Sequence, residues 1–426
     1  MHKRLPYAKI LILTAIVLAM ASVTAFAVAP ETEEVAADPD PGVGWEKCGD
    51  SLWYKIEGDV NKKLYFYGSG AMRDYDDGSG WVPAPGEGAP WHDPGIKEVI
   101  WTSDHCDITR IGGSAFVGCE GLTSMHWSND AKVEGEAIVP GSVTSVGKFG
   151  FYHNNGLTKI TFASGSKVSF DRYSMSGMES LEEIVINKAS SLPTIYPWAD
   201  YCHNLTKLTI NGNTSFDFQT FNGSSNLKTI EIGPDVTSVN GLRTTYYAME
   251  IDNYIVDPGN GTYLLDDGVL LRKSGSDLTV VAAPMNKEYY YMSDDVTKIG
   301  DGAFQSSSIK NLHISNKVTT IEAKAFLRAG SLQTVLLPDS CTYVGLAAFN
   351  QCTSLKTIHF GTGLKTMWAE SFEYSGIDKF DNNGKKVQIN YDSSWVNHQL
   401  TDQEIGYLKN TTFTKDGTTM KSTGNR

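Results

Sequence analysis

The stretch that decides the fold reads V-T-T-I-E-A-K-A-F-L-R-A-G-S-L-Q-T-V-L-L and occupies residues 318–337. Its frame recurs on both sides, so that phenylalanine returns at intervals of 22, 23 and 23 residues, at Phe304, Phe326, Phe349 and Phe372. One unit of this length is too small to bury its own apolar face. Repetition at such a period indicates units that stack and bury that face against each other. The sequence therefore predicts a solenoid.

Further copies of the frame lie earlier in the chain. They end at Phe116 and Phe151, with looser copies at Met175 and Phe221 and a degenerate one around Trp198. A leucine or isoleucine follows most of these residues, and apolar residues stand three and five positions after it, as in Ile160 and Phe162. Such alternation predicts a short, half-buried strand. About nine copies therefore predict a β-rich solenoid with short parallel strands, stacked in coils of about 22–23 residues.

Small residues stand at two fixed positions of the frame. Glycine follows the isoleucine or valine at Gly112, Gly147, Gly300 and Gly345. We expect a sharp corner there, where a side chain would clash. Alanine precedes the phenylalanine in several copies, which allows neighbouring coils to approach closely.

The first residues have the features of an export signal. Lys3, Arg4 and Lys9 precede an apolar run over residues 10–23, and the small residues Ala25 and Ala27 follow it. This pattern predicts a signal peptide over residues 1–27, cleaved after Ala27. An uncleaved membrane anchor is the alternative, although the run is short for a span. No second apolar segment of spanning length follows in the sequence, so we expect no membrane span after cleavage.

Residues 46–382 closely resemble the leucine-rich repeats of the BspA-like bacterial surface proteins, also known from treponemal leucine-rich proteins. Besides the frame, the resemblance includes C-G-D-S-L-W at 48–53, G-S-G-A-M-R-D-Y at 68–75, and Y-I-V-D at 254–257. It implies a leucine-rich-repeat solenoid with an N-terminal β-rich cap module and a β-hairpin insertion. The expected order is a disordered linker at 28–44, the β-rich module at 45–103, repeats at 104–241, the insertion at 242–295, repeats at 296–382, and a C-terminal cap or tail at 383–426.

The net charge and the cysteine positions bear on three kinds of function or site: nucleic-acid binding, disulfide bonds and metal binding. With 36 basic and 49 acidic residues the chain carries −13, which repels phosphate backbones and argues against nucleic-acid binding. The six cysteines fall mainly at repeat positions, where thiols act as small buried apolar groups. A bridge within one coil, Cys341 to Cys352 or Cys106 to Cys119, is the alternative. No C-x-x-C pair is present in the sequence, so we predict no metal site.

No cluster of residues predicts catalysis. The strands would place His126, His313 and His359 on the solvent side of the sheet, and His313 and His359 about 10 Å apart, too far for joint metal binding. The acidic run that begins at Asp74 lacks the later carboxylate of an EF-hand and reads as a solvated turn. Hydrolase, metalloprotease and phosphate-loop motifs are missing from the sequence. We therefore predict no enzyme and no cofactor.

Aromatic residues are the best candidates for binding. They gather in or beside the expected insertion, at Tyr246, Tyr247, Tyr254, Tyr263, Tyr289, Tyr290 and Tyr291. Tyrosine is enriched at interfaces, although it also simply favours strands. We add His313 and His359 to this candidate surface. The other exposed strand positions, Lys159, Glu183, Lys207 and Glu231, are mixed in charge and indicate no ligand class.

The sequence therefore predicts a secreted or cell-surface binding protein. Its partner would be an extracellular protein or glycan of the host, the matrix or a neighbouring cell, and adhesion its role. A structural protein of the cell envelope that associates with itself is the main alternative. An enzyme acting on glycans is a third.

The repeat register makes a direct prediction about stability. Phe326→Ala or Leu332→Ala opens a cavity between coils, so each should lower the free energy of unfolding by about 2–5 kcal/mol. Thermal and denaturant unfolding measure this loss. An unchanged melting temperature in either variant contradicts the register.

Overall fold

The structure is a computed structural model of the chain. It describes residues 40–75, 88–165, 167–187, 198–212, 226–240, 251–361, 363–367, 371–372 and 374–376, and the backbone of the short strands at 190–191, 214–215, 388–391, 412–415 and 418–421. The predicted signal peptide, most of the linker and the repeat copy at Phe221 lie outside these residues.

An antiparallel hairpin precedes the repeats. It pairs the short β1 (Glu46–Lys47) with β2 (Ser51–Glu57), and β2 with β3 (Lys62–Ala71). β3 then pairs in parallel with β4 (Ile96–Ile111), which supplies the first strand of the repeat array. The turn to parallel pairing at β4 marks where one coil begins to stack on the next.

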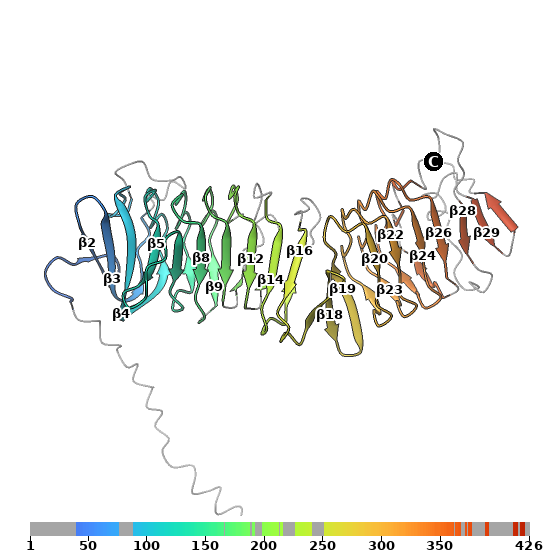
Figure 1. Ribbon diagram of the computed structural model, residues 1–426, viewed down its shortest axis with the longest axis horizontal. Helices are drawn as coiled ribbons and strands as arrows, with labels where there is room; N and C mark the ends of the chain where they lie inside the picture. Colours follow the sequence, from blue (N-terminus) through green and yellow to red (C-terminus); the bar gives the residue numbers. More distant parts are fainter. Residues whose placement is uncertain are drawn as a thin grey trace, which may run out of the picture. The chain divides into compact units, whose positions relative to one another are not determined.

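The strand predicted after each leucine is present, and its pairing is parallel and in register. Eight segments form this first column: the start of β4, then β5 (Ser124–Trp127), β6 (Glu136–Val139), β8 (Lys159–Phe162), β10 (Glu183–Ile186), β12 (Lys207–Ile210), β14 (Thr229–Ile232) and β16 (Asn253–Val256). They follow one another in chain order in Figure 1. The prediction of a parallel-stranded solenoid with about nine turns is thus confirmed.

One strand of this column was not predicted. β6 lies between β5 and β8, with no aromatic of the repeat frame between β5 and β6. Ala137 and Val139 are nevertheless buried and extend the inward alternation. The extra residues that contain β6 also explain why Phe116 and Phe151 are further apart in the sequence than other successive phenylalanines of the repeat frame.

A second column of two- or three-residue strands runs through the same 16-stranded sheet, along the segment that precedes the repeat glycine. It comprises the end of β4, β7 (Ser145–Val146), β9 (Val168–Phe170), β11 (Ser190–Ser191), β13 (Thr214–Ser215) and β15 (Val239–Asn240). Each coil is therefore tied to the next at two separate places.

Three antiparallel strands interrupt both columns: β17 (Tyr263–Asp266), β18 (Val269–Ser274) and β19 (Asp277–Ala282). Leu270 packs in the core of the first array, and its neighbour Leu271 packs in the core of the second. Because adjacent residues of a strand point to opposite faces, these strands carry apolar side chains for both cores. The extent of the insertion, 242–295, stays a prediction.

The second array repeats the same plan. β19 pairs in parallel with β21 (Lys298–Ile299), and β23 (Thr320–Ile321), β25 (Tyr343–Val344) and β27 (Thr366–Met367) continue that column. The other column consists of two sheets, one of β20 (Tyr289–Tyr291) and β22 (Asn311–His313), the other of β24 (Thr334–Leu336), β26 (Thr357–Phe360), β28 (Gln388–Tyr391), β29 (Thr412–Lys415) and β30 (Thr418–Lys421). β30 pairs antiparallel with β29.

The phenylalanines form the predicted buried column. Ring centroids of Phe304 and Phe326 lie 5.0 Å apart, those of Phe326 and Phe349 4.9 Å, and those of Phe349 and Phe372 5.2 Å, with nearly parallel planes. This spacing matches the distance between paired strands, so the rings follow the coils directly. In the degenerate copy Ala199 takes the phenylalanine position, and Trp198, one residue earlier, stacks on Phe170 at 4.4 Å.

The turn around each phenylalanine carries a third set of contacts between coils. The amides of Phe304, Phe326 and Phe349 donate to carbonyls of the next coil, each at 2.7 Å. The residues two before and two after the phenylalanine have positive φ, as at Lys324 (56°) and Arg328 (60°). Nothing in the sequence predicted this left-handed backbone, which favours glycine but holds lysine, arginine, serine and tyrosine here.

The repeat glycines have a more specific role than a sharp corner. Gly345 is absent from the residues with positive φ, and a Cβ there would lie 2.5 Å from the amide nitrogen of Ala323 in the preceding coil. At Gly147 it would lie 2.5 Å from the nitrogen of Gly113. The predicted clash is confirmed, and it is with the neighbouring coil's backbone.

No helix in the described residues is long and apolar enough to cross a membrane.

Gly345→Ala tests this close approach. The added methyl group forces two coils apart, so the free energy of unfolding should fall by about 1–3 kcal/mol. Gly261→Ala is the matched control, because a Cβ at Gly261 would meet nothing within 4 Å. Equal melting temperatures for the two variants would show that the glycine position is not a contact between coils.

Candidate binding surfaces

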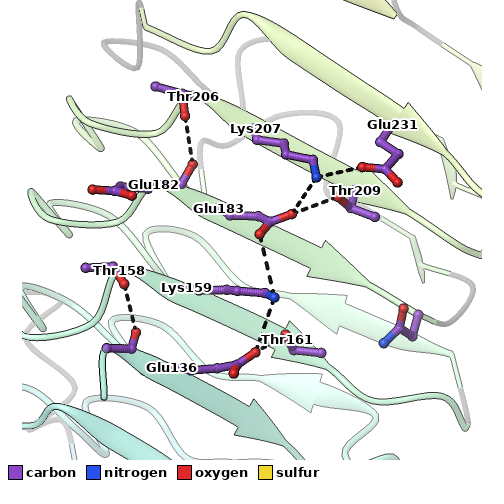
Figure 2. Close-up of polar contacts among 12 residues, drawn as sticks. Glu136, Thr158, Lys159, Thr161, Glu182, Glu183, Thr206, Lys207, Thr209 and Glu231 are labelled. Atoms are coloured by element: carbon purple, nitrogen blue, oxygen red, sulfur yellow. Dashed lines mark hydrogen bonds and ion pairs between the residues drawn. The ribbon is translucent and has the colours of Figure 1, made fainter. Parts of the chain in front are cut away.

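The outward side of the first array carries an ion-pair ladder (Figure 2). Five strands present side chains of alternating charge, in the order Glu136, Lys159, Glu183, Lys207 and Glu231. The four Nζ–Oε distances along it are 3.3, 3.6, 3.2 and 2.6 Å. Glu136, Lys159, Glu183 and Lys207 occupy the first position of their strands, which parallel pairing places about 4.8 Å apart, whereas Glu231 occupies the third position of β14, opposite Thr209. Like charges at these positions would therefore repel, whereas alternation makes every neighbour attractive.

The charged groups of the ladder are paired with one another. Burial alone would raise the pKa of Glu183, but hydrogen bonds from Lys207 and Thr209 outweigh it and hold that pKa below its usual range. The hydrogen bond to Glu231, with a smaller contribution from Glu183, raises the pKa of Lys207. Each exposed pair contributes at most about 1 kcal/mol. A charged ligand would have to break these pairs, so this face is a poor candidate for binding one.

His126 does not lie on the solvent side, so that prediction was wrong. It is buried on β5, beside Ile100 of β4, and its Nε2 lies 2.9 Å from Oε1 of Glu98. Its Nδ1 lies 2.8 Å from the carbonyl oxygen of Trp127. Lys63 on β3 pairs with the same carboxylate at 3.2 Å. Contacts through Glu98 thus link His126 on β5 to β4 and to Lys63 on β3 in one polar cluster.

The outward strand positions of the second array hold no aspartate, glutamate, lysine or arginine from β20 to β26. At the first and third positions of β20, β22, β24 and β26 stand Tyr289, Asn311, Thr334 and Thr357, and then Tyr291, His313, Leu336 and His359. Tyr289, Tyr291 and Leu336 are 60%, 69% and 60% exposed, and both histidines are exposed. The rings of Tyr291 and His313 stack at 4.1 Å. We call Tyr289, Tyr291, His313, Leu336 and His359 the neutral face.

Three tyrosines of the candidate surface lie in the core, so placing them on a binding surface was wrong. Tyr254, Tyr263 and Tyr290 are each no more than 3% exposed. Strand alternation explains Tyr290, because its neighbours Tyr289 and Tyr291 point outward. The hydroxyl of Tyr290 donates to Asp266, and the hydroxyl of Tyr263 accepts a hydrogen bond from the amide of Val239. Tyr246 and Tyr247 lie outside the described residues.

Leu336 is the member of the neutral face that sequence reasoning missed. It lies between Val335 and Leu337, whose side chains are buried. Three apolar residues in a row on a strand that alternates must place one of them outward. That signal was present in the sequence and could have identified it.

Comparison with known proteins agrees with this architecture. The family model described as "BspA type Leucine rich repeat region" matches residues 132–242 and 285–400, more than half of the chain, with 6 copies. The chain belongs to this family. No curated protein matches it.

Solved structures of bacterial leucine-rich-repeat proteins are similar to the chain. A leucine rich cell surface protein from Faecalibacterium prausnitzii A2-165 is 16% identical, with a TM-score of 0.51 over 90% of this chain and 97% of that one. The pneumococcal vaccine antigen PcpA is 17% identical, with a TM-score of 0.49 over 88% and 94%. At these identities the first likeness shows the fold alone.

The cysteine position of this BspA-type repeat has a defined structural role. The thiols of Cys119, Cys202 and Cys352 are buried, and each lies within 3.5 Å of a carbonyl oxygen of the preceding coil. Asn154, at the equivalent position of its copy, donates to the carbonyl of Phe116 at 2.9 Å. Met178 and Ala329 occupy the same position in two other copies and are fully buried, so the position takes a buried side chain that can be a donor or apolar. Burial also raises the pKa of Cys119 and Cys202 to about 12, so these thiols are poor nucleophiles.

The described residues hold no group of three or more histidine, cysteine or acidic side chains that could bind a metal ion. Asp74, which begins the acidic run, instead accepts hydrogen bonds from Arg110 and from the amide of Gly113. The remainder of that run lies outside the described residues.

Glu98 gives a pH-dependent prediction. Burial alone would raise its pKa, but the hydrogen bonds from His126 and Lys63 outweigh it and lower the pKa. A lowered carboxyl pKa stabilises the fold above the unfolded value, about 4.3, and that stability is lost as pH falls through the folded value. Glu98→Gln should cost about 1–3 kcal/mol at pH 7 and less at pH 3. Urea unfolding at both pH values checks this, and an equal cost at both would contradict it.

Proposed function

We propose that this protein is exported to the bacterial cell surface, or secreted, and binds an extracellular partner through the neutral face. Export is supported by the charged, apolar and small-residue order of residues 1–27. Membership of the BspA-type family supports a binding role. The similar Faecalibacterium protein is described as a cell surface protein, which favours the same location here.

The observation that carries this proposal is the contrast between the two arrays. Equivalent outward positions hold paired charges in the first array and exposed, uncharged side chains in the second. Exposed tyrosine and leucine side chains leave water at little cost, because no ion pair is broken and few polar groups need new partners. Contiguous apolar patches on a soluble protein mark interaction sites more often than single exposed residues do.

The chemistry of the neutral face favours a protein partner. Tyrosine offers a large, rigid contact area with a hydroxyl that can donate a hydrogen bond, and Leu336 adds an apolar contact between the two histidines. A glycan is the second candidate, since tyrosine and histidine can also bind sugar hydroxyls. Either partner would make the protein an adhesin if it belongs to a host, the matrix or a neighbouring cell.

A structural role in the envelope remains the alternative function. Against it, antiparallel strands begin and end the described parallel columns, at β1 to β3 and at β29 to β30. A second molecule would therefore meet these antiparallel strands and could not continue the stacking of coil on coil directly.

Binding to an array of extracellular-matrix proteins and glycans tests the proposal. Once a partner is identified, Leu336→Asp should weaken binding at least tenfold, about 1.4 kcal/mol, because it places a charge in the centre of the neutral face. Tyr201→Ala is the matched control, since Tyr201 is also exposed but lies in a turn of the first array. Unchanged affinity in Leu336→Asp, or no ligand for a folded monomer, would overturn the proposal.

A further inference from the structure

The strand column that carries the neutral face is interrupted where the two arrays meet. β20 pairs with β22 on one side, and no strand in the described part of the chain pairs with its other side. Among the same residues the preceding strand of the column, β16, pairs with β14 alone. The insertion β17–β19 lies between β16 and β20 in the sequence and pairs with neither of them. β20 is therefore an edge strand inside the solenoid.

The hydrogen bonds between β20 and β22 identify the backbone groups that this pairing uses. The amide of Asn311 donates to the carbonyl oxygen of Glu288, and the amide of Met292 donates to that of His313, both at 3.2 Å. Glu288 and Met292, which flank β20, thus direct their backbone groups toward β22. Because successive residues of a strand direct their N–H and C=O groups to opposite edges, every second residue between them does the same.

Tyr289 and Tyr291 direct their backbone groups to the other side, which we call the open edge of β20. No described residue outside β22 forms a hydrogen bond with the backbone of either tyrosine. Both residues are also exposed, at 60% and 69%. The open edge therefore offers two N–H donors and two C=O acceptors in a row. Such a row is a template for a further strand.

The side chains on both sides of the interruption are uncharged. Tyr289 and Tyr291 stand on β20, and the exposed Asn253 and Ile255 stand at the outward positions of β16. The ion-pair ladder ends one strand earlier, at Glu231 on β14. A strand added at the open edge would place its own outward side chains beside these residues. An uncharged segment fits best there, because a charged side chain would lose water without gaining an opposite charge.

We propose that the open edge of β20 binds an extended, uncharged segment of a partner protein as an added β-strand. The partner's backbone donates to and accepts from Tyr289 and Tyr291, and its side chains lie beside the neutral face. In this mode the main-chain hydrogen bonds supply affinity and the neighbouring side chains supply specificity. An extended polypeptide carries the alternating donors and acceptors that the edge requires. The inference rests on the proposed function and names the class of partner and its mode of binding.

Amide hydrogen exchange of the free, full chain tests whether the edge is open. The amides of Tyr289 and Tyr291 should exchange about a hundredfold faster than those of Met292 and Asn311, which donate within the pair of β20 and β22. Similar protection of all four amides would show that another segment of the chain covers the edge. That result would overturn the proposal without any ligand.

Peptide binding tests the added strand itself. The probes are short synthetic peptides of threonine, valine, serine and tyrosine, each with a polyethylene glycol tag for solubility, and they are screened against the immobilised full chain. Methylation of alternate backbone nitrogens should abolish binding in one register, where these nitrogens face β20, and have little effect in the other. The absence of any binding peptide, or equal effects in both registers, would overturn the proposal.

Two substitutions at one position separate the backbone from the side chain. Tyr291→Ala removes the ring and keeps the amide, whereas Tyr291→Pro removes the N–H as well. Proline is tolerated on an edge strand when its missing N–H takes no part in the pairing. Tyr291→Pro should bind the peptides at least about tenfold more weakly than Tyr291→Ala. Equal affinities would contradict the added strand, and the methylated peptides decide the matter on the wild type if Tyr291→Pro folds poorly.

The same variants distinguish this inference from the proposed function. A partner that Leu336→Asp loses, but that binds both Tyr291 variants equally, would keep the neutral face as the binding site and reject the added strand. A wild-type dimer that only Tyr291→Pro dissociates would assign the open edge to a second copy of the chain and would also reject the proposal. Sedimentation of the wild type and of both variants measures this.

Discussion

Hydrogen bonding between successive coils is the constraint on which the rest of the structure depends. A coil of this size contains no helix in the described residues and satisfies few of its backbone groups internally, so its amides and carbonyls must pair with the coils before and after it. The pairing occurs at two strand columns and again at the phenylalanine turn. Where all three ladders are present they fix the register, and equivalent residues then stack on each other along the array.

This strict stacking determines what the surface can do. Any side chain type repeated at one position becomes a row with a spacing of about 4.8 Å. Inside the protein that spacing favours flat rings and branched aliphatic side chains, as in the column of Phe304, Phe326 and Phe349. On the outward face, charged side chains at equivalent positions must alternate in sign, or the positions must hold uncharged residues. The first array alternates Glu183 with Lys159 and Lys207, whereas the second has no charged side chain at the outward positions of β20, β22, β24 and β26.

The sequence was sufficient for everything that depends on periodicity. Its repeat predicted the phenylalanine, leucine and isoleucine columns and their parallel strands, because burial at a fixed period leaves a direct signal. Three kinds of structural feature left no such signal in the sequence. The left-handed backbone at Lys324 and Arg328 is imposed by the turn ladder and not by the residue type. His126 is buried and contacts Glu98 of β4, a residue distant in sequence. The extra strand β6 has no aromatic turn of its own.

The candidate site was predicted in part, for the same physical reason. Tyr289, Tyr291, His313 and His359 are exposed as expected, because the repeat frame fixes which strand positions point outward. Composition alone selected Tyr254, Tyr263 and Tyr290, and it cannot distinguish an inward tyrosine from an outward one. Alternation along each strand would have separated them, and it would also have identified Leu336.

Amide hydrogen exchange at the phenylalanine turns tests the central claim most directly. The account predicts that the amides of Phe326, Lys324 and Arg328, which donate to the next coil at 2.7, 2.8 and 2.9 Å, exchange as slowly as amides in the adjoining strands. Rapid exchange at all three turn amides, with protection confined to the strands, would contradict it. The coils would then be joined by their strands alone, and the left-handed turns would have no structural cause.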